Sequence, residues 1–379
     1  MYYLFGFTEQ STDNKIAVCS RISRRVRGGV EKVRSQASLS LVPYSTASWA
    51  RAAQRGSWFS LPSALQREIG EVIAGWRAAA DQDFAVALFN LGLMFMHGRG
   101  VTQSDVEAAR LWKKGAEQGL AFAQLKFGFM CQEGRGTAKS DVEAALWYKK
   151  AADQGNAEAL RGLGSLYELG RDLPQSDVEA ARCYKKAAEL GDAEAQASMG
   201  FFSLLGRGHV AKDHFKAAFW FKKSANQGNA EAQCNLGILS QEGRGTVKSD
   251  VEAAFWYKKA ADQGSAQAQC NLGGLYSSGR GVVQNDVEAV KWYKKAAGQG
   301  DAAAQVNLGF YFRAGQGGVT QSDVEAAYWY KTAAEQGHVQ AQFNIGLMHQ
   351  HGRGVAKSDL EAAKWFKKAA EQGSAAAQA

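Results

Sequence analysis

The sequence contains little proline and no long apolar run. Its 379 residues include only three prolines, Pro43, Pro62 and Pro174. No apolar run reaches the roughly 18 residues that a membrane-spanning helix needs. The apolar stretch that opens the chain meets Glu9 too early to form the core of a signal peptide. We therefore expect neither a membrane span nor a secretory leader.

The five cysteines lack the paired spacing that is typical of a disulfide framework. They are Cys19, Cys131, Cys183, Cys234 and Cys270. The last two lie 36 residues apart, at the same position of successive repeats described below. Neighbouring helices pack about 8–10 Å apart, whereas a disulfide needs Cα atoms within roughly 4.4–6.8 Å. We expect five free thiols and therefore a reducing compartment such as the cytoplasm.

Acidic residues are scarce at the start of the chain. Residues 1–60 hold nine Lys and Arg but three acids, which places +6 of the total charge of +8 in this segment. Residues 61–379 carry the remaining +2, and nucleic-acid binding needs a clustered basic face. The Ser- and Arg-rich composition of the first segment is that of a transit peptide for a mitochondrion or plastid. A plain disordered extension is the alternative interpretation.

What the chain does contain is one short motif with a fixed period. A glycine preceded by Gln or Leu recurs at intervals of 36 or 37 residues. It stands at Gly119, Gly155, Gly191, Gly228, Gly264, Gly300, Gly337 and Gly373. Self-similarity at such a period is the signature of a solenoid of stacked units. The sequence therefore predicts eight tandem copies of one unit.

Residues 229–264 illustrate the unit. Apolar and small residues recur at helical spacing over about 230–242, and the glycine turn 243–245 ends this helix. Ser249 then precedes Glu252 by three residues, which is the pattern of a capping box at the start of a second helix. In such a box each of the two side chains is expected to accept a hydrogen bond from the backbone N–H of the other residue. Each unit is therefore predicted to be a helix–turn–helix.

The fourth unit departs from this pattern at its second helix. Asp213 takes the cap position, and Lys216 stands where the other units have Glu. One half of the capping box is lost there. We expect the weakest helix start in this unit, by a fraction of the roughly 1 kcal/mol that a cap contributes.

Two residue types repeat inside the helices and are expected to be structural. A glycine in the middle of each first helix lets the paired helix approach closely. These glycines are Gly92, Gly128, Gly164, Gly200, Gly237, Gly273, Gly309 and Gly346. A tryptophan recurs in the second helices, at Trp112, Trp147, Trp220, Trp256, Trp292, Trp329 and Trp365.

These residues resemble the Sel-one-like repeat family, a longer relative of the tetratricopeptide repeat. The family pattern, with A-x-A-Q and L-G in the first helix and W-Y-x-K-A-A-x-Q-G in the second, matches 229–264 and 265–300 nearly throughout. The resemblance covers roughly 84–373 and implies an all-α fold, an α/α solenoid that winds as a right-handed superhelix and acts as an adaptor. Some cysteine-rich members are credited with β-lactam binding, but this chain lacks their cysteine pairs.

The expected organisation has four parts. Residues 1–60 are a basic N-terminal segment that is disordered or directs targeting. Residues 61–83 form a degenerate capping helix, and 84–373 hold the eight repeats. Residues 374–379 begin an unfinished ninth repeat.

Solenoids of this kind bind partners on the concave face, which the first helices line. By analogy with tetratricopeptide arrays, the exposed positions lie two before the leucine of the Leu-Gly pair and one after its glycine. The expected partner-binding residues are Phe89, Leu93, Leu125, Phe129, Arg161, Phe201, Ile238, Val306, Phe310, Phe343 and Leu347. Burial of these positions between the helices is the alternative.

Two further ladders have open interpretations. The asparagines Asn90, Asn235, Asn271, Asn307 and Asn344 are placed either to bind an extended peptide backbone or to join neighbouring repeats. The Lys-Lys pair that recurs in the second helices is either a site for acidic partners or a solvated face, and the acids nearby favour the solvated face.

The expected function is a non-catalytic protein–protein interaction scaffold for a peptide or domain of unknown identity. We expect no catalytic residue, no metal site and no cofactor, because acids and hydroxyls recur at capping positions. The first alternative is an RNA-binding helical-repeat protein, which needs a basic groove. The second alternative is a hydrolase activity of the repeat family.

Overall fold

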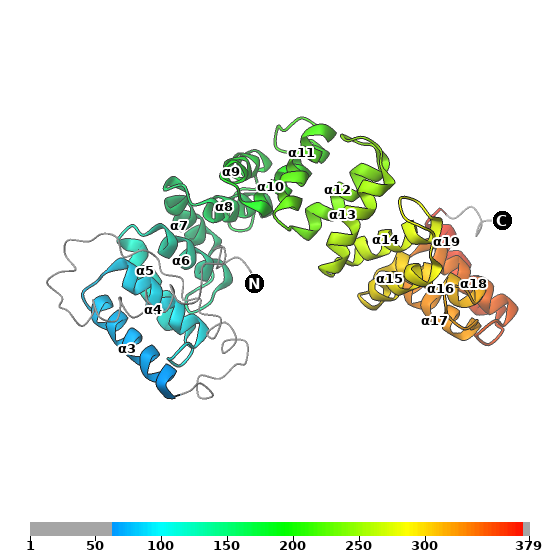
Figure 1. Ribbon diagram of the computed structural model, residues 1–379, viewed down its shortest axis with the longest axis horizontal. Coiled ribbons are helices and arrows are strands. Elements are labelled where there is room, and N and C mark those ends of the chain that lie inside the picture. The colour runs from blue at the N-terminus through cyan, green and yellow to red at the C-terminus, as the bar shows by residue number, and fades with distance from the viewer. Residues whose placement is uncertain (1–62, 374–379) are drawn as a thin grey trace. The chain divides into compact units, whose positions relative to one another are not determined.

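The computed structural model describes residues 63–373, and every regular element in this range is an α-helix (Figure 1). The seventeen helices are α3 and eight helix pairs. The first helices are α4 (Ala85–His97), α6 (Ala121–Glu133), α8 (Ala157–Leu169), α10 (Ala193–Leu205), α12 (Ala230–Glu242), α14 (Ala266–Ser278), α16 (Ala302–Ala314) and α18 (Val339–His351). The second helices are α5 (Asp105–Glu117), α7 (Asp141–Asp153), α9 (Asp177–Glu189), α11 (His214–Asn226), α13 (Asp250–Asp262), α15 (Asp286–Gly298), α17 (Asp323–Glu335) and α19 (Asp359–Glu371). The predicted all-α fold of repeated helix pairs is confirmed.

The helix α3 (Ser63–Ala80) precedes the pairs and packs against α4. Its buried Ile73 and Ala80 join a small apolar cluster with Leu88 and Leu91 of α4. The predicted N-terminal segment 1–60 and the start of a ninth repeat at 374–379 lie outside the described residues.

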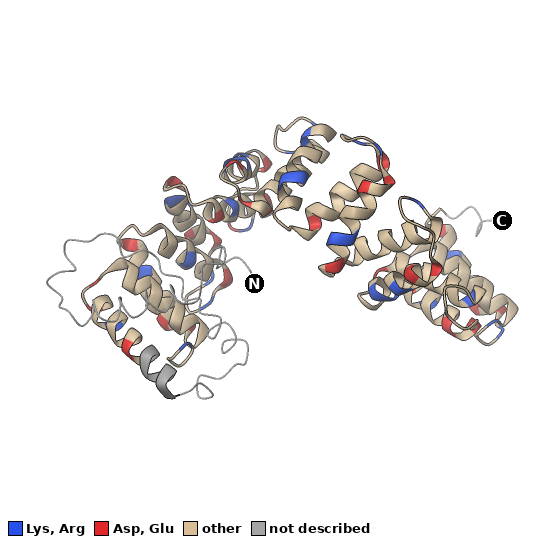
Figure 2. Ribbon diagram, viewed as in Figure 1, with Lys and Arg blue, Asp and Glu red and all other residues tan. Residues whose placement is uncertain are grey.

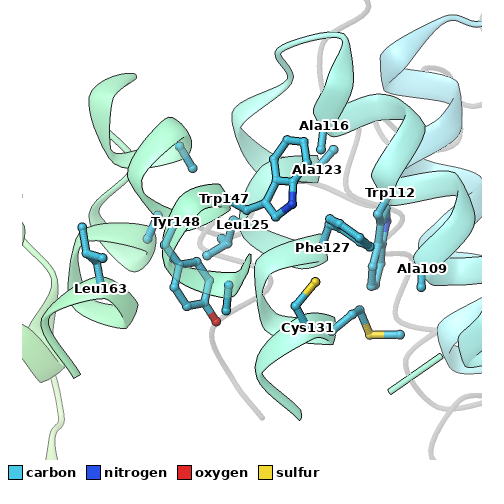
Figure 3. Packing of buried hydrophobic residues seen from close by; sticks show 14 of the residues in the cluster. Ala109, Trp112, Ala116, Ala123, Leu125, Phe127, Cys131, Trp147, Tyr148 and Leu163 are labelled. Carbon is cyan, nitrogen blue, oxygen red and sulfur yellow. The ribbon is translucent and has the colours of Figure 1, made fainter. Parts of the chain in front are cut away.

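The helices form two compact units, one ending at Leu190 and the other beginning at Gly191. Within each unit every helix packs against the next helix in the chain. In the first unit, Trp112, Phe127 and Trp147 come from α5, α6 and α7 and fill one continuous core (Figure 3). The rings of Phe127 and Trp147 meet edge to face, with their centroids 5.5 Å apart.

Each first helix ends at a glycine in the left-handed conformation, as Gly243 does with φ 72°. The second glycine of the turn also has positive φ and lies against the preceding second helix. A side chain on Gly245 would run into the carbonyl oxygen of His214. The third repeat carries Asp172 at this second position with φ 52°, a conformation that costs a non-glycine residue free energy. The turn is thus both a helix stop and a contact between repeats.

The second helices begin at polar caps, but the reciprocal half of the predicted capping box does not form. The Ser249 hydroxyl accepts a hydrogen bond from the backbone N–H of Glu252 at 3.1 Å, as predicted. The backbone N–H of Ser249 donates instead to the Ser240 carbonyl of the first helix at 2.8 Å. The expectation that the glutamate reaches back to this N–H is therefore wrong, because the first helix already supplies its acceptor.

The same geometry corrects the prediction of a weak start for α11. Asp213 accepts hydrogen bonds from the backbone N–H groups of Phe215 and Lys216, at 2.9 and 3.0 Å. Its own N–H donates to the carbonyl of Ser203 at 2.8 Å. Replacing the glutamate by Lys216 therefore removes no capping hydrogen bond.

The glycine in the middle of each first helix faces an aromatic ring of its paired second helix. A Cβ added to Gly237 would lie 2.6 Å from the Tyr257 ring, and one on Gly128 would lie 2.8 Å from the Tyr148 ring. The rings that face the other ladder glycines are Trp112, Tyr184, Phe221, Tyr293, Tyr330 and Phe366. The close approach of the two helices thus involves an aromatic ring in every repeat. In most repeats this ring belongs to the residue after the recurring tryptophan.

A network of glutamines, which the sequence analysis did not single out, joins the helices. Buried Gln233 donates through Nε2 to the Ala225 carbonyl of the preceding helix at 3.0 Å, and its Oε1 accepts from Gln263 Nε2 at 2.8 Å. Gln269 makes the equivalent pair of hydrogen bonds in the next repeat. The signal was present in the sequence, because this glutamine recurs with the period of the repeat.

Candidate protein-binding surface

The first set of predicted binding positions, two residues before the leucine, is largely buried. Phe89 is 6% exposed and Leu125 is 3% exposed, and both belong to the core of the first unit. The equivalent Ala197, Cys234 and Cys270 are also buried. The expected exposure of Phe89 and Leu125 is therefore wrong, because the helices of neighbouring repeats cover this position.

The remaining members of the first set are half-buried. Arg161 lies in the first unit, and Val306 and Phe343 lie in the second. Val306 packs at the edge of an apolar cluster, and the Phe343 ring lies 5.6 Å from the ring of Phe366. These three side chains are accessible only in part.

The second set, one residue after the ladder glycine, reaches solvent in every repeat. In the first unit Leu93 and Phe129 are half-buried and pack against the core on one side. In the second unit the half-buried members are Phe201, Ile238 and Leu347. Phe310 is 49% exposed. Each unit thus presents apolar side chains at one position of its first helices, interrupted by Ser165 and Gly274.

The asparagine ladder does not form one uniform set of contacts. Asn235 Nδ2 donates to the Glu231 carbonyl of its own helix at 2.9 Å. Asn344 Oδ1 accepts from Gln340 Nε2, again within one helix, at 3.1 Å. Both side chains are half-buried. Each amide therefore has further donor and acceptor positions that solvent can reach.

Burial lowers the reactivity of the cysteines that the structure describes. Burial raises the pKa of the Cys131 and Cys270 thiols to about 12, and that of Cys183 and Cys234 to about 11. These thiols are protonated near neutral pH and are poor nucleophiles. Among residues 63–373 no three His, Cys, Asp or Glu side chains gather to hold a metal ion.

Comparison with known proteins settles the family. The Sel1 repeat matches residues 85–120, 121–156, 157–192, 193–229, 230–265, 266–301, 302–338 and 339–374. The chain belongs to the Sel1 repeat family. The resemblance seen in the sequence is thereby confirmed.

Two solved structures support the assignment. One is a protective antigen present in uropathogenic Escherichia coli strains, which displays an SLR fold. Its sequence is 38% identical to this chain and its TM-score is 0.74, and the match covers 81% of this chain and 66% of that chain. The chain thus spans just under two thirds of that antigen. The other is a Sel1 repeat protein from Oxalobacter formigenes, with 31% identity and a TM-score of 0.59 over 83% of this chain and 91% of that chain. No curated protein matches the chain.

Sel1 repeat proteins are generally protein-interaction scaffolds without catalytic activity. Residues of both charge signs, Lys and Arg as well as Asp and Glu, are scattered over both units (Figure 2). Among residues 63–373 no helix has the length and apolar character to cross a bilayer.

The second helices of these Sel1 repeats carry exposed apolar residues that sequence reasoning missed. The second position of the helix is apolar and exposed in all eight repeats, and the sixth is apolar and exposed in four of them. Members with more than half of their surface exposed are Val106, Leu146, Phe215, Phe219, Val251, Phe255, Val287, Val324, Tyr328 and Leu360. Their periodicity in the sequence was the available signal.

The second lysine of the Lys-Lys pair covers the tryptophan of the same helix. Lys150 Nζ lies 4.0 Å from the centre of the Trp147 ring, and Lys295 Nζ lies 4.2 Å from that of Trp292. The cation–π contact leaves the ammonium group at the surface. The pair is therefore a surface feature of the repeat.

Proposed function

We propose that this Sel1 repeat protein is a non-catalytic scaffold whose first helices bind a segment of a partner protein. The observation that carries the proposal is the recurring apolar residue after the ladder glycine. Leu93 and Phe129 present it in the first unit, and Ile238 and Phe310 are among those that present it in the second. Apolar side chains that are half-exposed on a rigid scaffold are what a partner buries at an interface.

One substitution in each unit tests the proposal. Phe129→Glu and Phe310→Glu place a charge at the centre of the proposed surface, where desolvating it on binding is unfavourable. Partners captured by the wild-type protein and identified by mass spectrometry are then titrated against each variant. We expect the affinity for at least one partner to fall about tenfold or more, which corresponds to roughly 1.4 kcal/mol.

A matched control places the same charge on the second helices. Val106→Glu and Val324→Glu change residues that are 62% and 65% exposed, one in each unit. Circular dichroism and thermal unfolding check that all four variants keep their fold. Equal affinities for the phenylalanine and valine variants would rule out the first helices as the binding surface.

RNA binding receives no comparable support. Residues 61–379 carry a net charge of only +2, and charges of both signs are scattered over the two units. Cytoplasmic location is part of the proposal, because four buried free thiols suit a reducing compartment.

A further inference from the structure

The second helix of the fourth repeat differs in charge from all the others. α11 contains Lys216, Lys222 and Lys223 but no acid, which gives it a net charge of +3. The other second helices range from −2 in α17, with one Lys and three acids, to +1 in α15, with three Lys and two acids. One face of the second unit therefore has a local excess of positive charge that the repeat pattern does not require.

The same helix exposes two large aromatic side chains beside a pocket. Phe215 is 76% exposed and Phe219 is 51% exposed. With Ala218 and Leu236 they line a pocket of about 530 Å³, and Val247 of the following turn, which is 82% exposed, forms another wall. This volume lies within the range of about 300–1,000 Å³ that is common for ligand pockets.

Two lysines lie at this pocket. Lys222 lines it, and Lys223 Nζ lies 4.6 Å from the centre of the Phe219 ring. In the part of the chain that the structure describes, neither lysine forms an ion pair. Glu252 is the acid in the pocket wall, and it accepts a hydrogen bond from Trp256 Nε1 at 3.4 Å. The two lysines are thus free to pair with an incoming acid.

The fourth repeat lacks an inter-repeat ion pair that the first, second and fifth repeats have. Asp250 at the start of α13 binds Arg280 of the next turn through two hydrogen bonds of 3.0 and 2.8 Å. His214 occupies the equivalent position in α11. Arg244 lies 3.4 Å from its ring Nε2 through Nη2 and forms its ion pair with Glu242 of its own repeat. The fourth repeat thus replaces a two-bond ion pair by one long contact, and such a local departure from the repeat pattern is typical of a functional position.

We infer that α11 and the turn 243–249 form a docking surface for an acidic segment of a partner protein. One aromatic or aliphatic side chain of the segment enters the pocket between Phe215, Phe219 and Val247. Its carboxylates pair with Lys222 and Lys223, so charge complementarity selects the partner. This surface lies on a second helix and is separate from the first-helix surface proposed above. The chain's own residues 1–60 carry +6 and are therefore a poor match.

The test uses the full chain and a library of short synthetic peptides. Each peptide contains one Phe or Leu among Asp and Glu, and two matched libraries replace the acids by Lys or the apolar residue by Ser. Fluorescence polarisation measures binding and its dependence on salt. We expect the acidic peptides with an apolar residue to bind, and to bind at least about tenfold more tightly than either matched library.

Two variants locate the binding on α11. Phe215→Ser with Phe219→Ser removes the apolar walls, and Lys222→Glu with Lys223→Glu reverses the charge. Each is expected to weaken binding by about tenfold or more. Val324→Ser with Tyr328→Ser is the matched control, because it changes the same two positions on the acidic helix α17 and should leave binding unchanged.

A further variant separates binding from folding. His214→Asp with Lys216→Glu gives α11 the acidic first turn of the other second helices. Acids there interact favourably with the helix dipole, so the thermal midpoint should stay level or rise while acidic-peptide binding weakens. The inference is overturned if no acidic peptide binds, if the α11 variants bind as well as wild type, or if acids alone suffice without an apolar residue. It is also overturned if Phe215→Ser with Phe219→Ser dissolves a dimer of the chain, because the occupant is then a second copy.

Discussion

At the scale of single residues, a repeat sequence shows which residues recur, whereas neighbouring repeats decide what those residues do. The analogy with tetratricopeptide arrays placed Phe89 and Leu125 at the surface, but adjacent helices bury both side chains. Phe129 and Phe310, one position after the glycine, do reach solvent. The exposure of a side chain depends on the packing between neighbouring repeats. The sequence pattern of a single repeat therefore does not reveal it.

In one repeat of this chain, leucine replaces both glutamines of the hydrogen-bonded pair. The third repeat has Leu160 at the position of Gln233 and Leu190 at the position of Gln263. A buried amide is tolerated only with its partner, because an unpaired buried acceptor costs about 1–3 kcal/mol. The two glutamines are therefore expected to act as a unit.

We predict that Gln263→Leu lowers the free energy of unfolding by about 1–3 kcal/mol, because it leaves the buried Oε1 of Gln233 without its donor. Adding Gln233→Leu should recover part of this loss, as in the third repeat. Chemical denaturation of the two single variants and the double variant measures the coupling. Gln118→Leu is the control and should be nearly neutral, because Leu88 occupies the partner position in the first repeat. Strict additivity of the two substitutions would contradict the network.

At the scale of elements, the sequence predicted the helix pairs well because their ends are marked by local chemistry. Serine caps and left-handed glycines act within a few residues, so the sequence alone places the ends of α12 and the start of α13. The wrong expectation concerned the backbone N–H of the cap. Its acceptor is a carbonyl of the first helix nine residues earlier, as with Ser249 and Ser240. That partner is visible only once the two helices are packed.

The turn of the third repeat is predicted to carry removable backbone strain. Asp172 has φ 52°, whereas glycine occupies the equivalent turn position in the neighbouring second repeat, at Gly136. Asp172→Gly should raise the free energy of unfolding by about 0.5–1 kcal/mol, because glycine adopts this conformation without steric cost. Thermal and chemical denaturation measure the change. The reverse substitution, Gly136→Asp, should destabilise strongly, since its side chain would meet the Asp105 carbonyl. A lower midpoint for Asp172→Gly would show that the aspartate makes a contact worth more than the strain.

At the scale of the whole molecule, the repeats distribute the same buried groups along the chain, so their contributions add. Four thiols and several tyrosine hydroxyls lie in the cores of the two units. Burial raises the pKa of all four thiols, and it also raises the pKa of Tyr148 and Tyr257 above the ordinary tyrosine value. Shifts that lie in several repeats thus combine into a measurable property of the chain.

Alkaline pH is therefore predicted to destabilise the protein progressively. An exposed thiol ionises near about pH 8.5, whereas the buried thiols hold their protons until about pH 11 or 12. Below about pH 8.5 the thiols are protonated in the folded and in the unfolded chain, so the free energy of unfolding has its full value. Between the two values only the unfolded chain releases protons, so the free energy of unfolding falls as pH rises.

Denaturation midpoints measured across this range under reducing conditions test the prediction. Replacing Cys131, Cys183, Cys234 and Cys270 by alanine, with Cys19 replaced in both proteins, should flatten the decline below about pH 10, where tyrosine begins to ionise. An unchanged slope in that variant would mean that the thiols do not carry the effect.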